Sequence, residues 1–193
     1  MTVLLIGGSS HVGKSTLAQR LADRLSCACL CTDFLARHPG RPWRTPPDVV
    51  PPHVADYYLN LGVEEQMASV LAHYRALRPR IEAMIAKPET KSLVLEGSAV
   101  LPEILPPGPG VSGVWLTASE DLLAERIRRD SGYVAGDVTQ RRMIDAFVTR
   151  TVVFNRLILE EVSRRDLPHI RVERDLAIDE LAGIALSVAK TTR

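Results

Sequence analysis

One short stretch near the start of the sequence restricts the folds open to this chain more than any other feature. Residues 8–15 read Gly-Ser-Ser-His-Val-Gly-Lys-Ser and fit the pattern G-x-x-x-x-G-K-[ST] without a mismatch. Glycines let the backbone wrap an anion, and successive N–H groups then converge on phosphates at the positive end of a helix. In this pattern the lysine reaches the β- and γ-phosphates, and the final hydroxyl ligates Mg²⁺. The segment therefore predicts a phosphate-binding loop, or P-loop, for ATP.

The residues on either side of the loop have the required context. Thr2–Ile6 is an apolar run bounded by glycines, which predicts a buried strand. From Lys14 onward, apolar residues recur at the spacing of an amphipathic helix. We expect ATP to contact Gly8, Ser9, Ser10, His11, Val12, Gly13, Lys14, Ser15 and Thr16, with Lys14 also acting in catalysis.

The rest of the chain alternates between strand and helix patterns. Strands are expected at 28–32, 92–96, 111–117 and 169–173. Helices are expected at 53–87, with an interruption near Gly62 and with Pro79 and Pro88 as breaks or ends, and at 119–129, 138–165 and 176–190. This alternation predicts a three-layer α/β fold, a parallel sheet with helices on both faces. A length of 193 residues suits a single domain.

Composition excludes several kinds of partner. The 24 Lys and Arg oppose 23 Asp and Glu, so no overall charge favours nucleic acid or an anionic membrane. We expect a cytoplasmic protein, because the start has no basic leader and no apolar run approaches 18 residues.

The size argues against motor proteins, and neither Asn60 nor Asn155 lies in the Asn-Lys-x-Asp motif of GTPases. The long helix at 138–165 could serve a homodimer interface.

Two acidic residues follow predicted strands. Asp33 follows the second strand and Glu96 ends the third, at the sheet edge where ligands of parallel sheets bind. We assign Asp33 as the base that accepts the proton of a substrate hydroxyl, and Glu96 as the carboxylate on the Mg²⁺ side with Ser15. Both acids are also expected to contact the substrate, and their roles could be exchanged. The alternative is that each acid accepts hydrogen bonds from nearby backbone N–H groups.

Arginines surround a break in the helical pattern. Arg126, Arg128 and Arg129 precede the Gly-containing residues 131–137, and Arg141 and Arg142 follow them. Phosphoryl transfer needs positive charge over the migrating group, often from a closing lid, so we expect a lid near 126–142 with Arg126 and Arg129 as its catalytic residues. The alternative is a solvated helix end, where the helix dipole favours cations.

The stretch after Asp33 combines arginines with an aromatic residue on a proline-rich segment. Guanidinium groups of Arg37 and Arg41 suit a carboxylate or phosphate, and the ring of Trp43 can stack on a substrate ring. We therefore expect the phosphoryl acceptor to bind in the region 33–87. A rigid surface loop with scattered charge is the competing interpretation.

Cys27, Cys29 and Cys31 alternate over five residues. Small apolar side chains along one strand face are the expected role, because free cysteine packs well in cores. A metal cluster is the alternative, although zinc ligands usually come as C-x₂₋₄-C pairs with further ligands elsewhere.

These motifs together resemble a known group. The chain is similar to the nucleoside-monophosphate, shikimate and chloramphenicol kinase superfamily in its strand–P-loop–helix start, Asp33, Glu96-Gly97 and Arg-rich lid. Within it, Gly7–Ser15 and Leu95-Glu96-Gly97 look most like 2-phosphoglycerate kinase-like proteins. The resemblance implies strand order 2-3-1-4-5, ATP as donor and a mobile lid at 131–137.

The leading hypothesis is an ATP- and Mg²⁺-dependent kinase for a hydroxyl of a small polar metabolite or antibiotic-like molecule. A nucleoside or nucleotide kinase is the second hypothesis, although residues 37–44 give no clear base-binding pattern. A non-catalytic, ATP-binding regulatory protein is the third.

Overall fold

The computed structural model describes residues 2–35, 38–43, 49–88 and 90–190. Its strands are β1 (Thr2–Gly8), β2 (Ala28–Cys31), β3 (Ser92–Glu96), β4 (Val111–Ala118) and β5 (His169–Val172). Its α-helices are α1 (Lys14–Leu25), α2 (Pro52–Asn60), α3 (Val63–Ala86), α4 (Glu120–Asp130), α5 (Val138–Arg164) and α6 (Ile178–Lys190). Short 3₁₀ turns are η1 (Thr32–Phe34), η2 (Pro102–Ile104) and η3 (Tyr133–Ala135).

The five strands form one parallel sheet in the order β2-β3-β1-β4-β5, which confirms the expected topology. Strand β1 lies in the middle, between β3 and β4, with Ile6 opposite Glu96 and Gly7 opposite Trp115. The P-loop that follows β1 therefore lies at the centre of the edge formed by the carboxyl ends of the strands. In open parallel sheets this edge is where ligands bind.

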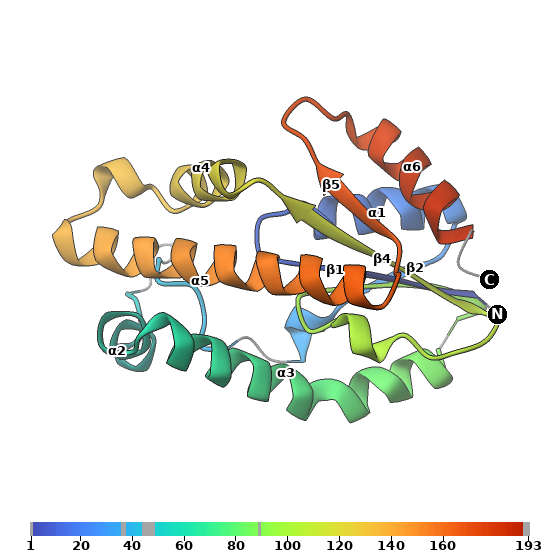
Figure 1. Cartoon of the computed structure of the whole chain (residues 1–193), viewed down its shortest axis with the longest axis horizontal. Helices are drawn as coiled ribbons and strands as arrows, with labels where there is room; N and C mark the ends of the chain where they lie inside the picture. Colours follow the sequence, from blue (N-terminus) through green and yellow to red (C-terminus); the bar gives the residue numbers. More distant parts are fainter. Residues whose placement is uncertain (1, 36–37, 44–48, 89, 191–193) are drawn as a thin grey trace.

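Helices cover both faces of the sheet (Figure 1). Successive side chains of a strand point to opposite faces. Accordingly, Leu4 and Ile6 of β1 pack with α1 and α6, whereas Val3 and Leu5 pack with α3. Helix α5 adds a second apolar cluster, with α3, around the fully buried Trp115. The three-layer α/β prediction is therefore confirmed.

Some predicted boundaries were wrong. Pro79 lies inside α3 without ending it. The carbonyl that loses its amide partner belongs to Arg75, and both residues are exposed, so water can replace the missing hydrogen bond. Strand β2 ends at Cys31, whose Sγ accepts a hydrogen bond from the Asp33 backbone N–H at 3.4 Å and starts a 3₁₀ turn.

The final helix begins at Ile178, two residues later than expected. Residues 174 and 175 form a turn, and Leu176 lines a cavity beside the P-loop instead of occupying a helical position. The break near Gly62 is confirmed, because α2 ends at Asn60 and α3 starts at Val63.

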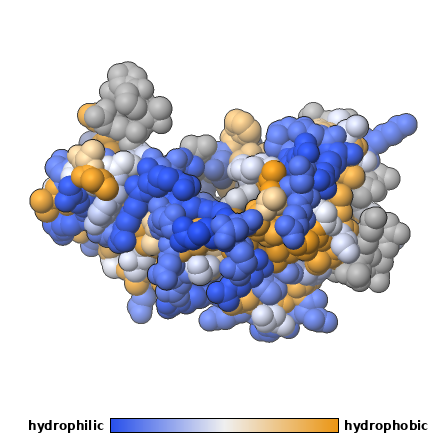
Figure 2. Space-filling view, turned by 90° about the horizontal axis from the view of Figure 1, so that it is seen from above, coloured by the Kyte–Doolittle hydropathy of each residue, from blue (hydrophilic) through white to orange (hydrophobic). Residues whose placement is uncertain are grey.

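Hydrophilic side chains cover much of the face seen in Figure 2, and hydrophobic side chains gather in smaller groups between them. Within the described ranges, no helix is long and apolar enough to cross a bilayer.

The packing of Trp115 generates a stability prediction. A Cβ at Gly7 would lie 2.3 Å from the Trp115 ring and 2.4 Å from the Val100 carbonyl oxygen, which the indole N–H also binds at 2.9 Å. Because neither group has room to move, we expect Gly7→Ala to lower the free energy of unfolding by about 1–3 kcal/mol. Urea denaturation measures this change.

Gly183→Ala is the matched control, because Gly183 lies inside α6 with open space where a Cβ would stand. Alanine is the better helix former, so the free energy of unfolding of this variant should rise by up to about 1 kcal/mol. Equal effects of the two substitutions would contradict the packing argument.

Candidate active site

The P-loop connects β1 to α1 at the centre of the sheet edge. Its two pattern glycines have positive φ, 137° at Gly8 and 108° at Gly13. A Cβ at Gly8 would also lie 2.4 Å from the Leu116 carbonyl oxygen. The pattern therefore needs glycine both for its backbone angles and for its close approach to β4.

The Lys14 side chain is folded onto its own loop. Its Nζ donates a hydrogen bond to the Ser9 carbonyl oxygen at 2.6 Å, and the residue is only 7% exposed. Burial lowers the pKa of Lys14, while the nearby carboxylates Glu96 and Asp33 raise it. The ammonium is thus held beside the loop, where the lysine of this pattern would reach the phosphates of ATP.

Ser15 and Glu96 present oxygen atoms suited to Mg²⁺. Ser15 Oγ donates to Glu96 Oε1 at 2.9 Å, and Glu96 is buried at the end of β3. Among the described residues, no group of three or more His, Cys, Asp or Glu could form an all-protein metal site. One carboxylate and one hydroxyl fit Mg²⁺, which commonly takes its other ligands from phosphate and water.

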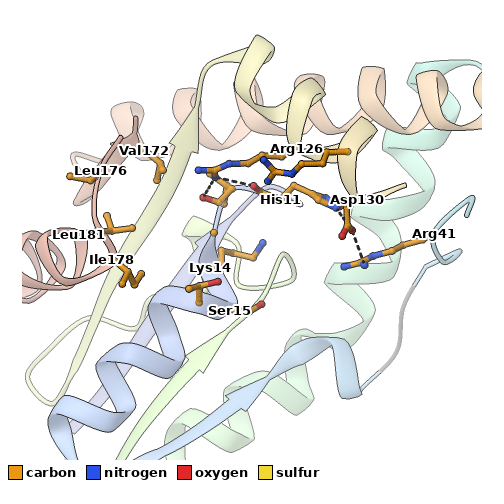
Figure 3. Close-up of a pocket in the computed structure, with 14 residues that line it drawn as sticks. His11, Lys14, Ser15, Arg41, Arg126, Asp130, Val172, Leu176, Ile178 and Leu181 are labelled. Atoms are coloured by element: carbon orange, nitrogen blue, oxygen red, sulfur yellow. Dashed lines mark hydrogen bonds and ion pairs between the residues drawn. The ribbon is translucent and has the colours of Figure 1, made fainter. Parts of the chain in front are cut away.

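A cavity of 540 Å³ lies beside the loop, and we call it the P-loop cavity. Residues 11–16, from the P-loop and the start of α1, line it together with Arg41, Arg126, Arg129 and Asp130. Val172, Leu176, Ile178 and Leu181 form an apolar end, and Arg41 lies at the opposite end (Figure 3). Lys14 and Ser15 lie between these ends. The apolar end was not predicted from the sequence; its residues come from β5, α6 and the turn that joins them.

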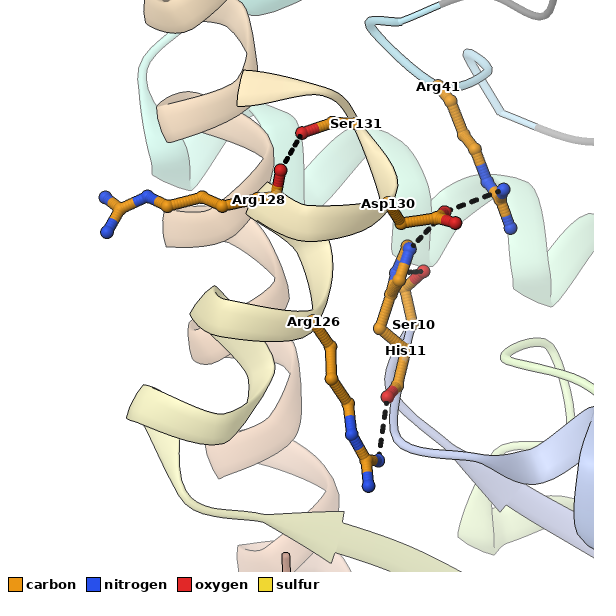
Figure 4. A network of polar contacts seen from close by, with 7 residues as sticks. All are labelled: Ser10, His11, Arg41, Arg126, Arg128, Asp130 and Ser131. Atoms are coloured by element: carbon orange, nitrogen blue, oxygen red, sulfur yellow. Dashed lines mark hydrogen bonds and ion pairs between the residues drawn. The ribbon is translucent and has the colours of Figure 1, made fainter. Parts of the chain in front are cut away.

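The two arginines expected on a lid both line this cavity. Arg126 Nη1 donates to the carbonyl oxygens of His11 and Val12, each at 3.2 Å, so α4 is tied to the P-loop backbone. Arg129 is exposed at the cavity wall. By contrast, Arg128 points away from the loop, as Figure 4 shows, and pairs with Asp145 at 2.9 Å.

The segment 131–137 is a short turn held by α5. Tyr133 Oη donates to Asp145 at 2.8 Å, and Arg141 donates to the carbonyl oxygens of Tyr133 and Val134. That this segment closes as a lid stays a prediction.

A second, smaller cavity of 70 Å³ contains Asp33, and we call it the Asp33 cavity. Its lining is Ser10, Asp33, His38, Gly40, Arg41, Tyr74, Ser98, Phe147 and Arg150. A hollow of 20 Å³ shares four of these residues and extends the space along α5. Because Ser10 belongs to the P-loop, this cavity lies directly beside the phosphate-binding segment.

Arg150 is the buried cation of the Asp33 cavity. It is 8% exposed, and its Nη1 has no hydrogen-bond partner. Its guanidinium lies over the rings of Phe147, Tyr58 and Tyr57, at 4.8, 5.2 and 5.9 Å from their centroids. A buried guanidinium with an unused donor is suited to bind an anionic group.

The predicted acceptor loop is only partly described. Arg41 lines both cavities, whereas Arg37 lies outside the described residues. The Trp43 ring packs against Phe147, with centroids 5.0 Å apart, and near His11 at 5.7 Å. Its stacking on a substrate ring stays a prediction.

Sequence reasoning also missed Arg150 and Asn155, although both carry a signal. They lie on the buried face of α5 among apolar residues at helical spacing, including Phe147, Phe154 and Ile158. A polar side chain in such a stripe is expensive to bury unless it has a structural or functional partner. Arg150 lines the Asp33 cavity, and Asn155 accepts a hydrogen bond from Ser9 of the P-loop.

The three cysteines are free thiols. Cys27 and Cys29 pack against the cluster under α1, as expected for small apolar side chains. Burial and a hydrogen bond with Glu96 raise the pKa of Cys31 to about 12. In the part of the chain that the structure describes, no cysteine belongs to a metal-binding group.

Comparisons with known proteins place the fold. No protein-family model and no curated protein matches the chain. A gluconokinase from Sinorhizobium meliloti 1021 is similar in structure at 18% identity and TM-score 0.52, covering 99% of this chain and 93% of that one. The shikimate kinase of Aquifex aeolicus VF5 has 13% identity and TM-score 0.52, covering 98% and 96%.

Deoxyadenosine kinase from M. mycoides, solved with bound dATP, has 12% identity and TM-score 0.53, covering 96% and 98%. The chain has the P-loop kinase fold. These P-loop kinases are named for three different acceptors, so the shared fold does not identify the acceptor here. The 2-phosphoglycerate kinase-like resemblance stays a prediction.

Asn155 generates a prediction for the loop. Its side chain accepts hydrogen bonds from Ser9 Oγ and from the Ala118 N–H, both at 3.3 Å, and donates to the Ala118 carbonyl oxygen at 3.0 Å. Asn155→Ala would leave these buried groups unpaired, so we expect a loss of about 2–3 kcal/mol in unfolding free energy. Thermal denaturation measures it.

Asn60, the other asparagine of the chain, is exposed at the end of α2 and provides the control. Asn60→Ala should change stability by less than about 0.5 kcal/mol. If both variants were equally stable, the tie between α5 and the loop would be energetically unimportant.

Proposed function

We propose that this chain is a kinase that transfers the γ-phosphoryl group of ATP to a hydroxyl of a small anionic metabolite. The observation that carries the proposal is the Asp33 cavity, which combines a carboxylate and a buried guanidinium beside the P-loop. The P-loop alone would fit any ATP-binding protein. A second cavity beside it, with a candidate base, favours a transferase over a regulatory protein.

The donor would lie along the P-loop cavity. Its apolar end suits a nucleobase, and the loop amides with Lys14 suit the phosphates. Mg²⁺, held by Ser15 and Glu96 when bound, would neutralise phosphate charge. Arg126 and Arg129 line the same cavity and would add positive charge along the phosphates.

The acceptor would lie in the Asp33 cavity. Its hydroxyl oxygen forms a bond to the γ-phosphorus, the bond from that phosphorus to the ADP oxygen breaks, and the hydroxyl proton passes to the Asp33 carboxylate. Asp33 lies on an exposed turn at the cavity wall, where a small substrate can reach it.

The size and charge of this cavity favour a small acid over a nucleoside. Its volume of 70 Å³ is a small fraction of the 540 Å³ available beside the loop. The unused Nη1 of Arg150 would bind a carboxylate or phosphate of the acceptor. The overall charge of +1 gives no reason to expect a nucleic acid or a membrane as partner.

The first test is a mass-shift screen of the purified protein with ATP, Mg²⁺ and a panel of sugar acids, hydroxy acids, aminocyclitols, hydroxylated antibiotics and nucleosides. A product heavier by one phosphoryl group is expected among the acids. Lys14→Ala should lower the rate at least about a hundredfold, because a phosphate-binding charge is lost. Asp33→Asn should lower kcat about 10²- to 10⁴-fold, because the base is lost.

Lys91→Ala is an exposed control away from both cavities and should keep the wild-type rate. A protein that binds ATP yet phosphorylates nothing, with Asp33→Asn indistinguishable from wild type, would favour the regulatory alternative.

Arg150→Met tests the class of acceptor. The substitution keeps much of the volume and removes the donors, so KM for an acidic acceptor should rise about tenfold to hundredfold. KM for the matched neutral alcohol should change little. The melting temperature should stay the same or rise, because an incompletely paired buried charge is removed. An equal loss for acidic and neutral acceptors would contradict the assignment.

A further inference from the structure

Arg41 belongs to the lining of both cavities. Among the described residues, it alone lines both the P-loop cavity and the Asp33 cavity. A phosphoryl group that moves from a donor in the first to an acceptor in the second must pass where the two cavities meet. The guanidinium of Arg41 is therefore beside the path of the transferred group.

The order of residues along the P-loop cavity supports this placement. The apolar end, Lys14 and Ser15, and Arg41 follow one another from one side of the cavity to the other (Figure 3). A nucleotide with its base at the apolar end and its phosphates at Lys14 would point its terminal phosphate toward Arg41. Guanidinium groups bind phosphate oxygens through paired N–H donors.

Arg41 is held by Asp130 from α4 and by Trp43 from its own segment. Asp130 Oδ2, at the end of α4, pairs with Arg41 Nη1 at 3.4 Å and accepts a hydrogen bond from His11 Nε2 at 3.0 Å (Figure 4). On the other side, the Arg41 guanidinium lies 5.6 Å from the centroid of the Trp43 ring.

His11 supports Asp130 without competing for its charge. Burial lowers the pKa of His11, and the positive charges of Arg41 and Lys14 act in the same direction against the opposing effect of Asp130. A neutral imidazole that donates through Nε2 leaves Nδ1 to accept from Ser10 Oγ, 2.9 Å away. The negative charge of Asp130 is then balanced mainly by Arg41.

We propose that Arg41 contacts the phosphoryl group during transfer and that Asp130, supported by His11, positions it. This inference rests on the proposed function. The role first expected for Arg41 was binding of the acceptor, and the inference changes that role. Arginines that stabilise the transferred group would then lie both on α4 and on the segment before α2.

Paired nucleotide affinities test the inference without any acceptor. Calorimetry with Mg²⁺ would compare ADP with the β,γ-imido analogue of ATP, which differs by the terminal phosphate. We expect Arg41→Met to weaken binding of the ATP analogue on the order of ten- to hundredfold. Binding of ADP should change little, because only the terminal phosphate would reach Arg41.

Arg128→Met is the matched control. Arg128 also pairs with an aspartate and lies over an aromatic ring, Tyr133 at 5.0 Å, but it lines neither cavity. Both affinities should stay at the wild-type values. Equal weakening of ADP and the analogue by Arg41→Met, or no weakening, would overturn the inference while leaving the proposed function intact. Failure of the wild-type protein to bind either nucleotide would overturn both.

Asp130→Asn tests the positioning role. With the ion pair half-exposed, we expect the preference for the ATP analogue over ADP to fall about twofold to fivefold. In the Arg41→Met background the same substitution should cause no further fall in this preference, because the fall passes through Arg41. A full additional change in that background, or none in the wild type, would show that Asp130 does not position Arg41.

Discussion

The hydrogen bonds of Asn155 hold together the parts on which both cavities depend. One side chain on α5 joins the start of the P-loop at Ser9 to the end of β4 at Ala118. Arg150 lies five residues earlier on the same helix and reaches the Asp33 cavity. The buried face of one helix thus fixes the position of the loop and of the predicted acceptor site relative to each other. Close packing of that face against the sheet keeps this arrangement in place.

Charge in this molecule is organised locally. The whole chain carries a formal charge of only +1, yet Lys14, Arg41, Arg126 and Arg129 converge on one cavity. Lys14 lies near Glu96 and Asp33, Arg41 pairs with Asp130, and Arg126 donates to carbonyl oxygens of the P-loop. Such an arrangement gathers positive charge at the cavity where we propose that the phosphates of ATP bind.

The fold could be predicted from the sequence because its signals are local. The P-loop pattern, the apolar spacing of Leu17 and Leu21, and the apolar run of β1 each fixed an element, and strand–helix alternation fixed the parallel sheet. The strand order came from a family resemblance. The P-loop, Asp33 and Glu96 were placed at the correct sheet edge because each follows or ends a predicted parallel strand.

What the sequence could not give was long-range pairing. The apolar end of the P-loop cavity comes from residues far along the chain from the loop, and Asp130 meets His11 across 119 positions. Helical spacing alone cannot say which neighbour a residue such as Arg150 will have. Pro79 also shows that a helix breaker is tolerated where water can bind the freed carbonyl.

The bond between Arg126 and the P-loop carbonyls has a thermodynamic consequence. It makes α4, the helix that leads into residues 131–137, sensitive to the conformation of the nucleotide-binding backbone. If a bound nucleotide favours one orientation of α4, then that orientation must favour the nucleotide by the same free energy, because linkage between two equilibria is reciprocal. Any molecule that stabilises this orientation from the far side of α4 would therefore act as an effector of nucleotide affinity without touching the loop.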